Sequence, residues 1–255
     1  MGSFSGQILY SLFPAKCPCC GEFCPSTGLC SACILLNLPR TEPRCRLCDS
    51  ADVGTQVVAK CQKCLTNRRY FDRVWGVFDY SSPVGEAVKN GKSEGRPEHL
   101  RTVARIVAEH MPEALKLDPP DVVIPVPLHW RRRLKRGFSA PSSIAHHIAR
   151  KLKRPVWQGA ITRIIDTPKQ TGLDEPARRR NVKGAFRARA IGGLDILVVD
   201  DVFTTGSTMN EIAKVLKQGD ALRVRGLCAA YVEREDARAK EPPVGWTSSA
   251  NTVVA

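Results

Sequence analysis

The stretch Ile196-Leu197-Val198-Val199-Asp200-Asp201-Val202-Phe203-Thr204-Thr205-Gly206-Ser207-Thr208 decides the fold of this chain. Its four leading apolar residues predict a strand that is buried on both faces, as in a parallel sheet. Two adjacent carboxylates follow where we expect that strand to end, and a helix is expected to open after the glycine. Because open parallel sheets bind ligands at the carboxyl ends of their strands, we expect this segment to line a binding site.

The residue types of this segment suit a sugar phosphate. Glycine lets the backbone come close to a phosphate, and the N–H groups of a helix N-terminus complement its negative charge. Asp200 and Asp201 offer acceptors for ribose hydroxyls, and the 5′-phosphate would be held by Thr204, Thr205, Gly206, Ser207 and Thr208. The alternative is a buried strand that enters an N-capped helix, with the acids as turn formers. That alternative explains one Asp and one Thr, but not two acids followed by three threonines around a glycine.

Length and charge limit the class of protein. A chain of 255 residues can form one sizeable domain and a small one. The formal net charge of +14 favours phosphate-rich partners such as nucleotides, nucleic acid or anionic membranes, although solubility alone is an alternative explanation. No apolar run is long enough to cross a membrane, and the N-terminus lacks the basic region of a secretory signal. We therefore expect a cytoplasmic protein without membrane insertion.

Ten of the eleven cysteines precede residue 65. Two Cys-x-x-Cys pairs complete a tetrahedral Cys₄ zinc site, and in a reducing compartment this pattern indicates metal rather than disulfides. Residues 1–68 contain no histidine, so both predicted Zn²⁺ sites look structural rather than catalytic. The predicted ligands form four such pairs: Cys17/Cys20, Cys30/Cys33, Cys45/Cys48 and Cys61/Cys64.

The pairing of these four units is left open by their spacing. Neighbouring pairs can share one metal, or the two sites can interleave. Cys19 and Cys24 are spare thiols near the first pair, and either could replace a ligand. So short a segment buries little apolar core, and we expect metal binding to supply its folding energy.

The chain after Cys64 alternates between strand and helix patterns. Strands are expected over 73–80, 121–124, 160–165, 195–199 and 222–232, and helices over 82–92, 97–111, 142–153 and 207–217. This alternation predicts an α/β domain with a parallel sheet. We therefore divide the chain into a Cys-rich domain (1–68), an α/β domain (69–234) and a polar tail (235–255) that we expect to be disordered.

The segment from Ile196 to Thr208 resembles the phosphoribosyl-pyrophosphate (PRPP) signature of type I phosphoribosyltransferases. It has the hydrophobic run, the two acids, two apolar residues and then Thr-Thr-Gly-x-Thr. The order of the pieces along the chain resembles the ComF family, which joins a double zinc ribbon to a phosphoribosyltransferase domain. Besides the Cys pairs, the segments that carry this resemblance are 125–129, 136–138, 170–173, 179–186 and 200–208.

The resemblance implies a type I phosphoribosyltransferase-like open parallel sheet with a small N-terminal double zinc-ribbon domain. It implies that Asp200 and Asp201 hold the ribose hydroxyls, directly or through Mg²⁺. The turn after the 121–124 strand, with Val126, Pro127 and Leu128, would be the pyrophosphate loop. The alternative for this turn is a rigid strand exit without a ligand.

One basic region is a candidate for action on the leaving group, and a second resembles a loop that closes over PRPP. Departing pyrophosphate gathers negative charge, so catalysis needs metal and cationic side chains more than a strong base. Within the basic run 131–136, Arg136 is the favoured candidate. The simpler explanation for most of this run is a set of charges that face solvent or nucleic acid. The resemblance also implies a loop that closes over PRPP, made of Gln170, Thr171, Gly172, Arg179 and Arg180. A mobile surface loop without a role is the alternative.

The chain departs from the family pattern after Arg136-Gly137-Phe138, where Ser139-Ala140-Pro141 replaces the usual Asn-Gln. Ala140 cannot replace an amide side chain, so the identity of the acceptor and the occurrence of catalysis are both left open.

The family is associated with DNA uptake in natural transformation. One implied function is transfer of the phosphoribosyl group to an unknown acceptor with release of pyrophosphate, in DNA uptake or nucleotide metabolism. A second is a non-catalytic PRPP or nucleotide sensor that binds single-stranded DNA. In a third, the zinc ribbons only dock a partner such as a DNA-uptake protein.

Overall fold

The computed structural model describes residues 15–17, 19–24, 29–36, 44–51, 60–93, 97–129, 138–166, 175–189 and 191–233. The predicted tail at 235–255 lies outside these ranges. So do Arg136 and the lid residues Gln170, Thr171 and Gly172.

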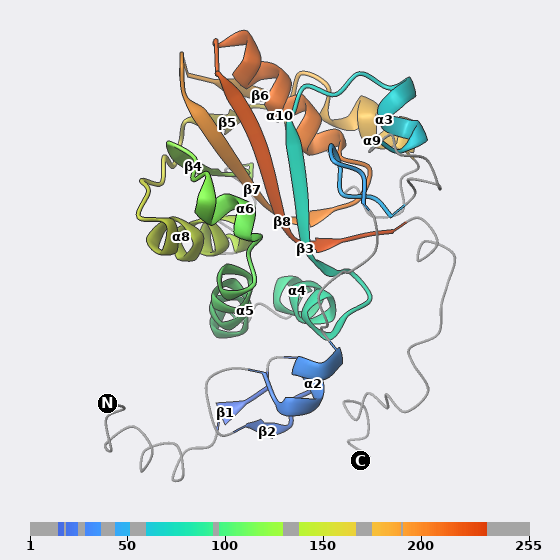
Figure 1. The fold of residues 1–255 in the computed structure, drawn as a ribbon, viewed down its shortest axis with the longest axis vertical. Helices are drawn as coiled ribbons and strands as arrows, with labels where there is room; N and C mark the ends of the chain where they lie inside the picture. Colours follow the sequence, from blue (N-terminus) through green and yellow to red (C-terminus); the bar gives the residue numbers. More distant parts are fainter. Residues whose placement is uncertain are drawn as a thin grey trace.

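Four strands form the central sheet, in the order β3 (Arg73–Asp79), β8 (Arg223–Tyr231), β7 (Asp195–Phe203) and β4 (Val122–Pro125). All three pairings between them are parallel. The two central strands, β7 and β8, are the longest and consist largely of buried residues, as a sheet covered on both faces requires. The predicted open parallel sheet is confirmed (Figure 1).

Strand β7 is longer than its apolar run predicts. We expected the strand to end at Val199, but it continues through the two acids to Phe203. The reason is that β8 also extends this far, so Val202 pairs with Ala230 and Phe203 pairs with Tyr231. The acid pair therefore lies on the last part of a paired strand, which holds its backbone more firmly than a loop would.

Helices cover both faces of the sheet. One face packs against α4 (Pro83–Ser93), α5 (Pro97–Glu109), α6 (Glu113–Leu117) and α8 (Ala140–Leu152). The other packs against α10 (Ser207–Gln218) and α9 (Glu175–Val182), and against the antiparallel pair β5 (Ile161–Arg163) and β6 (Phe186–Ala188). Alternate residues of β7 point to the two faces, with Leu197 and Val199 in one apolar cluster and Ile196 and Val198 in the other. The helices predicted over 82–92, 97–111, 142–153 and 207–217 are present, with ends within two residues of the prediction.

The Cys-rich region attaches to the α/β domain at two places. Its first part contains β1 (Ala15–Lys16), β2 (Phe23–Cys24) and α2 (Ser31–Leu36), and its cysteines join the apolar cluster that contains α4 and α5. Its second part contains α3 (Gln62–Thr66) and joins the opposite cluster, beside α9 and β3. Figure 1 shows α2 next to α4 at the foot of the molecule and α3 next to α9 near its top. Within the described ranges, no helix is long and apolar enough to cross a membrane.

Candidate functional site

The carboxyl ends of β4 and β7 bring two of the predicted site segments together. Pro125 of β4 is in register with Val199 of β7, and the Val126 N–H donates a hydrogen bond of 2.8 Å to the Val199 carbonyl. The predicted pyrophosphate turn therefore leaves the sheet next to Asp200. Val126 is buried, while Pro127 and Leu128 are partly exposed at this edge.

The two acids lie next to the buried thiol of Cys228. Asp200 and Asp201 are partly exposed, and the Asp201 N–H donates a hydrogen bond of 2.8 Å to Oδ1 of Asp200. Cys228 is in register with Asp200 and is fully buried. Burial raises the pKa of Cys228 well above its usual value, and the negative charges of Asp200 and Asp201 raise it further. Cys228 therefore stays a neutral thiol beneath the acid pair.

The residues after the acids form a turn that can hold an anion. Gly206 adopts a left-handed backbone conformation with φ of 74° and caps the N-terminus of α10. The hydroxyls of Thr205 and Ser207 lie 2.8 Å apart, and the Ser207 N–H donates to the Thr205 hydroxyl at 3.4 Å. The first N–H groups of α10 lack partners within the helix, as at any helix N-terminus. A left-handed glycine, two hydroxyls and a helix N-terminus thus come together within one short turn, which suits a phosphate group.

The far end of the pyrophosphate turn lies close to Asp166, which precedes the predicted lid in the sequence. His129 is 6% exposed, and its Nδ1 lies 3.7 Å from Oδ2 of Asp166. Asp166 is the last described residue before 167–174, which contain the first part of the predicted lid. No local pattern predicts this pair, because 37 positions separate the two residues.

The described part of the predicted lid points towards the Cys-rich region. Arg179 and Arg180 are exposed on α9. Nη1 of Arg179 donates a hydrogen bond of 2.9 Å to Oδ1 of Asn67, just after α3. Helix α9 is therefore tied to the segment that carries the last pair of cysteines.

The unusual sequence at Ser139 begins a helix. Ser139 is the N-cap of α8, and its hydroxyl accepts a hydrogen bond of 3.4 Å from the Ser142 N–H. Pro141 suits the first turn of a helix, and Ala140 is buried against the core. In this chain the positions that hold Asn-Gln in the family therefore start a helix and supply a cap.

The eight predicted metal ligands form two groups. Within each group, the four sulfur atoms all lie within 4.8 Å of one another. The groups are Cys17, Cys20, Cys30 and Cys33 (the first Cys₄ group) and Cys45, Cys48, Cys61 and Cys64 (the second Cys₄ group). Neighbouring pairs thus share a site, which settles the pairing that the spacing left open. Cys19 and Cys24 belong to neither group, although both are buried beside the first.

The sulfur geometry fits a tetrahedral ion. Zn–S bonds of about 2.3 Å place tetrahedral sulfurs about 3.8 Å apart. The Sγ atoms of Cys20 and Cys30 lie 3.6 Å apart, as do those of Cys48 and Cys61. Hydrogen bonds from Cys48 and Cys64 lower the pKa of Cys45, which favours the thiolate form that zinc binds. Each group could hold a zinc ion.

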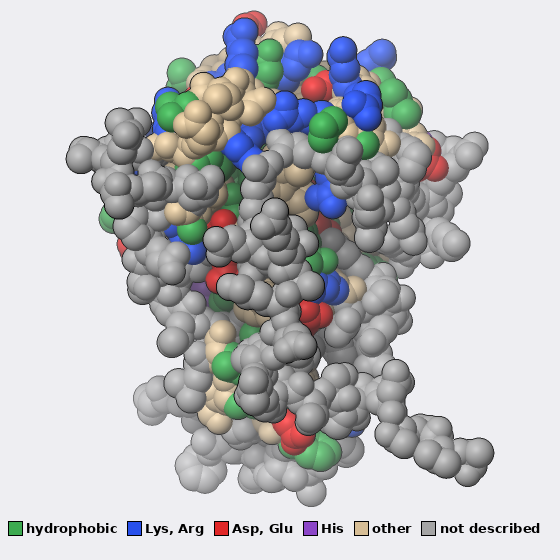
Figure 2. Space-filling view, turned by 90° about the vertical axis from the view of Figure 1, so that its right-hand side faces the viewer, with side chains coloured by type: hydrophobic (Ala, Val, Ile, Leu, Met, Phe, Trp, Pro, Cys, Tyr) green, Lys and Arg blue, Asp and Glu red, His purple; other side chains and the backbone are tan. Residues whose placement is uncertain are grey.

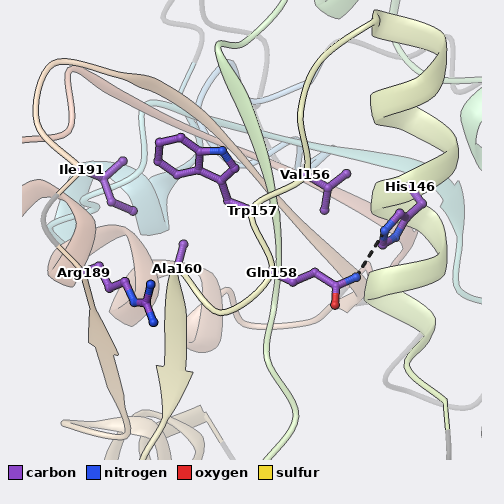
Figure 3. Close-up of a pocket in the computed structure, with 7 residues that line it drawn as sticks. All are labelled: His146, Val156, Trp157, Gln158, Ala160, Arg189 and Ile191. Atoms are coloured by element: carbon purple, nitrogen blue, oxygen red, sulfur yellow. Dashed lines mark hydrogen bonds between the residues drawn. The ribbon is translucent and has the colours of Figure 1, made fainter.

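The described residues include a separate pocket of about 540 Å³ beside the edge of the sheet. Figure 3 shows Gln158 pointing to His146, with its amide nitrogen 3.2 Å from Nε2 of the ring. His146 Nδ1 lies 2.7 Å from the Ser142 carbonyl, which favours a proton on Nδ1 and an acceptor at Nε2. The pocket contains none of the predicted sugar-phosphate residues and no carboxylate; its lining is His146, Val156, Trp157, Gln158, Ala160, Arg189 and Ile191.

Comparison with known proteins adds relatives that match most of the chain. The DNA utilization protein YhgH of Salmonella typhimurium is 32% identical over 207 residues, which cover 79% of this chain and 89% of the relative. YhgH of Escherichia coli K12 is 32% identical over 209 residues, with the same two coverages. Competence protein F of Haemophilus influenzae is 31% identical over 214 residues, covering 80% of this chain and 91% of the relative.

No protein-family model matches the chain. Among solved structures, a purine phosphoribosyltransferase from Pyrococcus horikoshii is similar at 17% identity and a TM-score of 0.31, covering 52% of this chain and 80% of that one. A hypoxanthine phosphoribosyltransferase from Trypanosoma cruzi is similar at 18% identity and a TM-score of 0.35, covering 56% and 69%.

Proposed function

The chain belongs to the ComF family, which includes competence protein F and the DNA utilization proteins YhgH, and from that premise we propose that it binds PRPP and transfers its phosphoribosyl group. One observation carries the proposal: β4 and β7 are paired, so the turn at 125–129 leaves the sheet beside the segment 200–208. The second segment suits a ribose 5-phosphate and the first suits pyrophosphate. Together they match the two halves of PRPP.

The proposed roles follow from the chemistry of each residue. Asp200 and Asp201 accept hydrogen bonds from the ribose hydroxyls, and the turn from Thr204 to Thr208 binds the 5′-phosphate. Val126, Pro127 and Leu128 form the turn that meets the pyrophosphate. Because the Val126 N–H bonds to the Val199 carbonyl and Pro127 has no N–H, the Leu128 N–H is the donor that these three residues offer. Mg²⁺ bound with PRPP would supply positive charge that neutralises the leaving group. The carboxylates beside the turn are ligands of the kind that Mg²⁺ prefers.

In the proposed reaction the bond from C1 of the ribose to the pyrophosphate oxygen breaks. Pyrophosphate leaves with the bonding electron pair. A lone pair on the nitrogen of an acceptor base or amine forms the new bond to C1, and the acceptor releases a proton to solvent. Arg136 stabilises the charge on the leaving group, and the segment that includes Gln170, Thr171, Gly172, Arg179 and Arg180 closes over PRPP to exclude water.

We also propose that both Cys₄ groups hold structural zinc and that the protein acts in the cytoplasm, where thiols stay reduced. The chain divides into a zinc-ribbon domain (1–68), a phosphoribosyltransferase-like domain (69–234) and a tail (235–255). Since a ribbon packs on each face of the sheet, the ribbons also offer surfaces on which DNA-uptake proteins could dock.

Calorimetric titration of PRPP in the presence of Mg²⁺ tests the binding site. The variant Asp200→Asn/Asp201→Asn should lose the binding of the wild-type protein. Asp220→Asn is the control, because Asp220 is an exposed carboxylate between α10 and the start of β8, at the opposite end of the sheet from the acid pair. Equal PRPP affinity in the wild type and the double variant would contradict the assignment. Release of pyrophosphate in the presence of candidate bases and amines then tests the transfer step.

A second candidate function is single-stranded DNA binding, and a basic surface favours it. Figure 2 shows Lys and Arg side chains gathered at the upper end of the face that it displays. Several basic residues of α3, α9, α10 and their flanks are at least partly exposed, and the hydrogen bond from Arg179 to Asn67 joins two of these elements. We define this basic surface as Lys63, Arg68, Arg179, Arg180, Lys183 and Lys214.

Salt dependence tests this second function. If three residues of the basic surface contact phosphates, Arg68→Gln/Arg180→Gln/Lys183→Gln should reduce the slope of log Kd against log salt by about 2 for a single-stranded oligonucleotide. The control Arg150→Gln/Lys151→Gln/Arg154→Gln removes the same charge at exposed positions around the end of α8. Equal slopes for the two triple variants would argue against the basic surface.

A further inference from the structure

We infer that the second Cys₄ group positions the phosphate turn, the segment from Thr204 to Thr208. Metal held by these four cysteines then strengthens the binding of a sugar phosphate at that turn, and a chain of packed aromatic rings connects the two places. Tyr231 and Phe203 are the positioning residues. This inference rests on the proposed function for its ligand, but the packing that carries it does not depend on that ligand.

The first step runs from the phosphate turn to Phe203. A Cβ atom placed on Gly206 would lie only 2.6 Å from Cζ of Phe203. The ring of Phe203 therefore fills the space directly under the turn. Phe203 is 4% exposed, so the ring cannot swing into solvent without opening the core. The position of this ring therefore limits how closely the turn can approach the core.

The second step runs from Phe203 to Tyr231. Their ring centroids are 5.1 Å apart and the ring planes differ by 14°, which is a stacked pair. The Val232 N–H also donates a hydrogen bond of 2.8 Å to the Phe203 carbonyl. Phe71 also meets Phe203, edge to face, with centroids 6.4 Å apart. Phe203 thus contacts both Tyr231 and a residue that follows α3.

The third step runs from Tyr231 to the second Cys₄ group. Tyr231 lies in the same buried cluster as the four cysteines, and its phenol interacts with Cys48 and Ser50. Tyr231 therefore packs on the knuckle of the metal site, the turn that carries Cys45 and Cys48.

The knuckle itself is anchored to the sheet. The Val74 N–H donates a hydrogen bond of 2.8 Å to the Leu47 carbonyl, and the Gly76 N–H donates one of 2.9 Å to Oδ2 of Asp49. Nη1 of Arg44 lies 2.7 Å from Oε1 of Glu233, two residues after Tyr231. Edge strand β3 and the end of β8 therefore hold the knuckle from two sides.

A separate tether reaches α10. Oδ1 of Asn210 accepts a hydrogen bond of 2.8 Å from the Tyr70 N–H, and Nδ2 of Asn210 lies 3.5 Å from the Arg68 carbonyl. Asn210 is in the first turn of α10, directly after the phosphate turn, and residues 68–70 follow the helix that carries Cys64. Both ends of the second Cys₄ segment thus connect to the phosphate turn, through Tyr231 and through Asn210.

The first Cys₄ group provides a matched control within the same chain. It has the same four ligands, but it joins the apolar cluster on the other face, which contains neither Phe203 nor Tyr231. Loss of its metal should leave the phosphate turn in place. The comparison separates a specific coupling from a general need for zinc.

The experiment compares Cys45→Ser/Cys48→Ser with Cys17→Ser/Cys20→Ser, each purified and measured for zinc content. Loss of zinc from the second group should weaken PRPP affinity by about tenfold or more, within the range of known couplings between sites. Loss from the first group should change it less than about twofold. Because coupling is reciprocal, PRPP should raise the affinity of the protein for one of its two zinc ions, measured at equilibrium by competition with a zinc-selective chelator. Equal losses of PRPP affinity in the two variants would overturn the inference.

Variants of the rings cover the case in which the cysteine variants fail to fold. In zinc-loaded protein, Tyr231→Phe keeps the stacked ring and should keep PRPP affinity, whereas Tyr231→Leu should lose it about as much as the second-group variant does. Hydrogen exchange provides a readout that needs no ligand. Amides of 204–210 should exchange faster in Tyr231→Leu while those of β4 stay unchanged.

These measurements separate the two proposals. If wild-type protein does not bind PRPP, the proposed function fails, and the exchange rates of 204–210 still decide the coupling. If wild-type protein binds PRPP but Tyr231→Leu changes neither affinity nor exchange, the coupling fails and the proposed function stands.

Discussion

The Val126 N–H donates a hydrogen bond of 2.8 Å to the carbonyl of Val199. This single bond joins the first residue after β4 to the residue before the acid pair. It makes the two candidate ligand segments neighbours, although 73 positions separate them in the sequence. The site is therefore a product of strand pairing, and its integrity depends on the sheet as much as on the motif.

Gly206 should tolerate no side chain. Gly206→Ala places a Cβ 2.6 Å from the Phe203 ring and forces a non-glycine residue to a φ of 74°. We expect the free energy of unfolding to fall by about 2–4 kcal/mol, with loss of PRPP binding. Gly159→Ala is the control, since Gly159 has a φ of 82° but no atom within 4 Å of its Cβ position. Denaturant unfolding should show a smaller loss for Gly159→Ala, and equal losses would contradict the steric argument.

The buried ion pair at the other end of β7 should contribute to stability without affecting the site. Arg225 is 4% exposed, and its Nε donates a hydrogen bond of 3.1 Å to Oδ1 of Asp195, which is 6% exposed. Asp195→Ala leaves Arg225 buried without this partner. The free energy of unfolding should fall by about 3–5 kcal/mol, while the PRPP affinity of the folded fraction stays the same. A weaker PRPP affinity of folded Asp195→Ala protein, measured without urea, would contradict the expectation that this ion pair affects stability alone.

Asp118 should make stability depend on acid. A hydrogen bond from Arg223 lowers the pKa of Asp118 from its usual 3.8, with further help from the charge of Arg225. Because the folded pKa is the lower one, the stabilisation is present above about pH 4 and is lost as the pH falls through the folded pKa. Asp118→Asn should therefore flatten the acid side of the curve of unfolding free energy against pH. A curve that keeps its full acid slope would show that other carboxyls are responsible.

Zinc content should follow the two Cys₄ groups. We expect two zinc ions per chain by elemental analysis, from the two groups of four sulfurs. Chelation should expose the eight ligand thiols to alkylation and lower the melting temperature, because metal binding contributes folding energy in so small a segment. Cys228 should stay unreactive until the chain unfolds, since it is fully buried. One zinc ion per chain would contradict the two-site assignment.

The predictable parts of the fold are those with a local pattern. The apolar run of β7, the helix after Gly206 and the four Cys-x-x-Cys pairs are each visible within a few residues, and the structure contains all of them. The length of β7 was not predictable in this way. Its last residues, from Asp200 to Phe203, are strand because β8 lies alongside, and that pairing has no local signal.

Parts of the candidate site could not be predicted from local sequence patterns either. The stack of Phe203 on Tyr231 and the bond from Tyr70 to Asn210 join residues that are far apart in the chain. Apart from Phe203, none of these residues belongs to a motif that can be recognised in the sequence. These residues come together near the phosphate turn because the second Cys₄ group packs on β3 and β8.

The most direct test of the central claim is a crystal structure of the protein with PRPP and Mg²⁺. We predict the 5′-phosphate on the turn from Thr204 to Thr208, the ribose hydroxyls at Asp200 and Asp201, and the pyrophosphate beside Val126 and Pro127. A complex with PRPP bound elsewhere, for example in the pocket beside Trp157, would contradict the account. So would crystals grown at saturating PRPP in which the carboxyl ends of β4 and β7 hold no ligand.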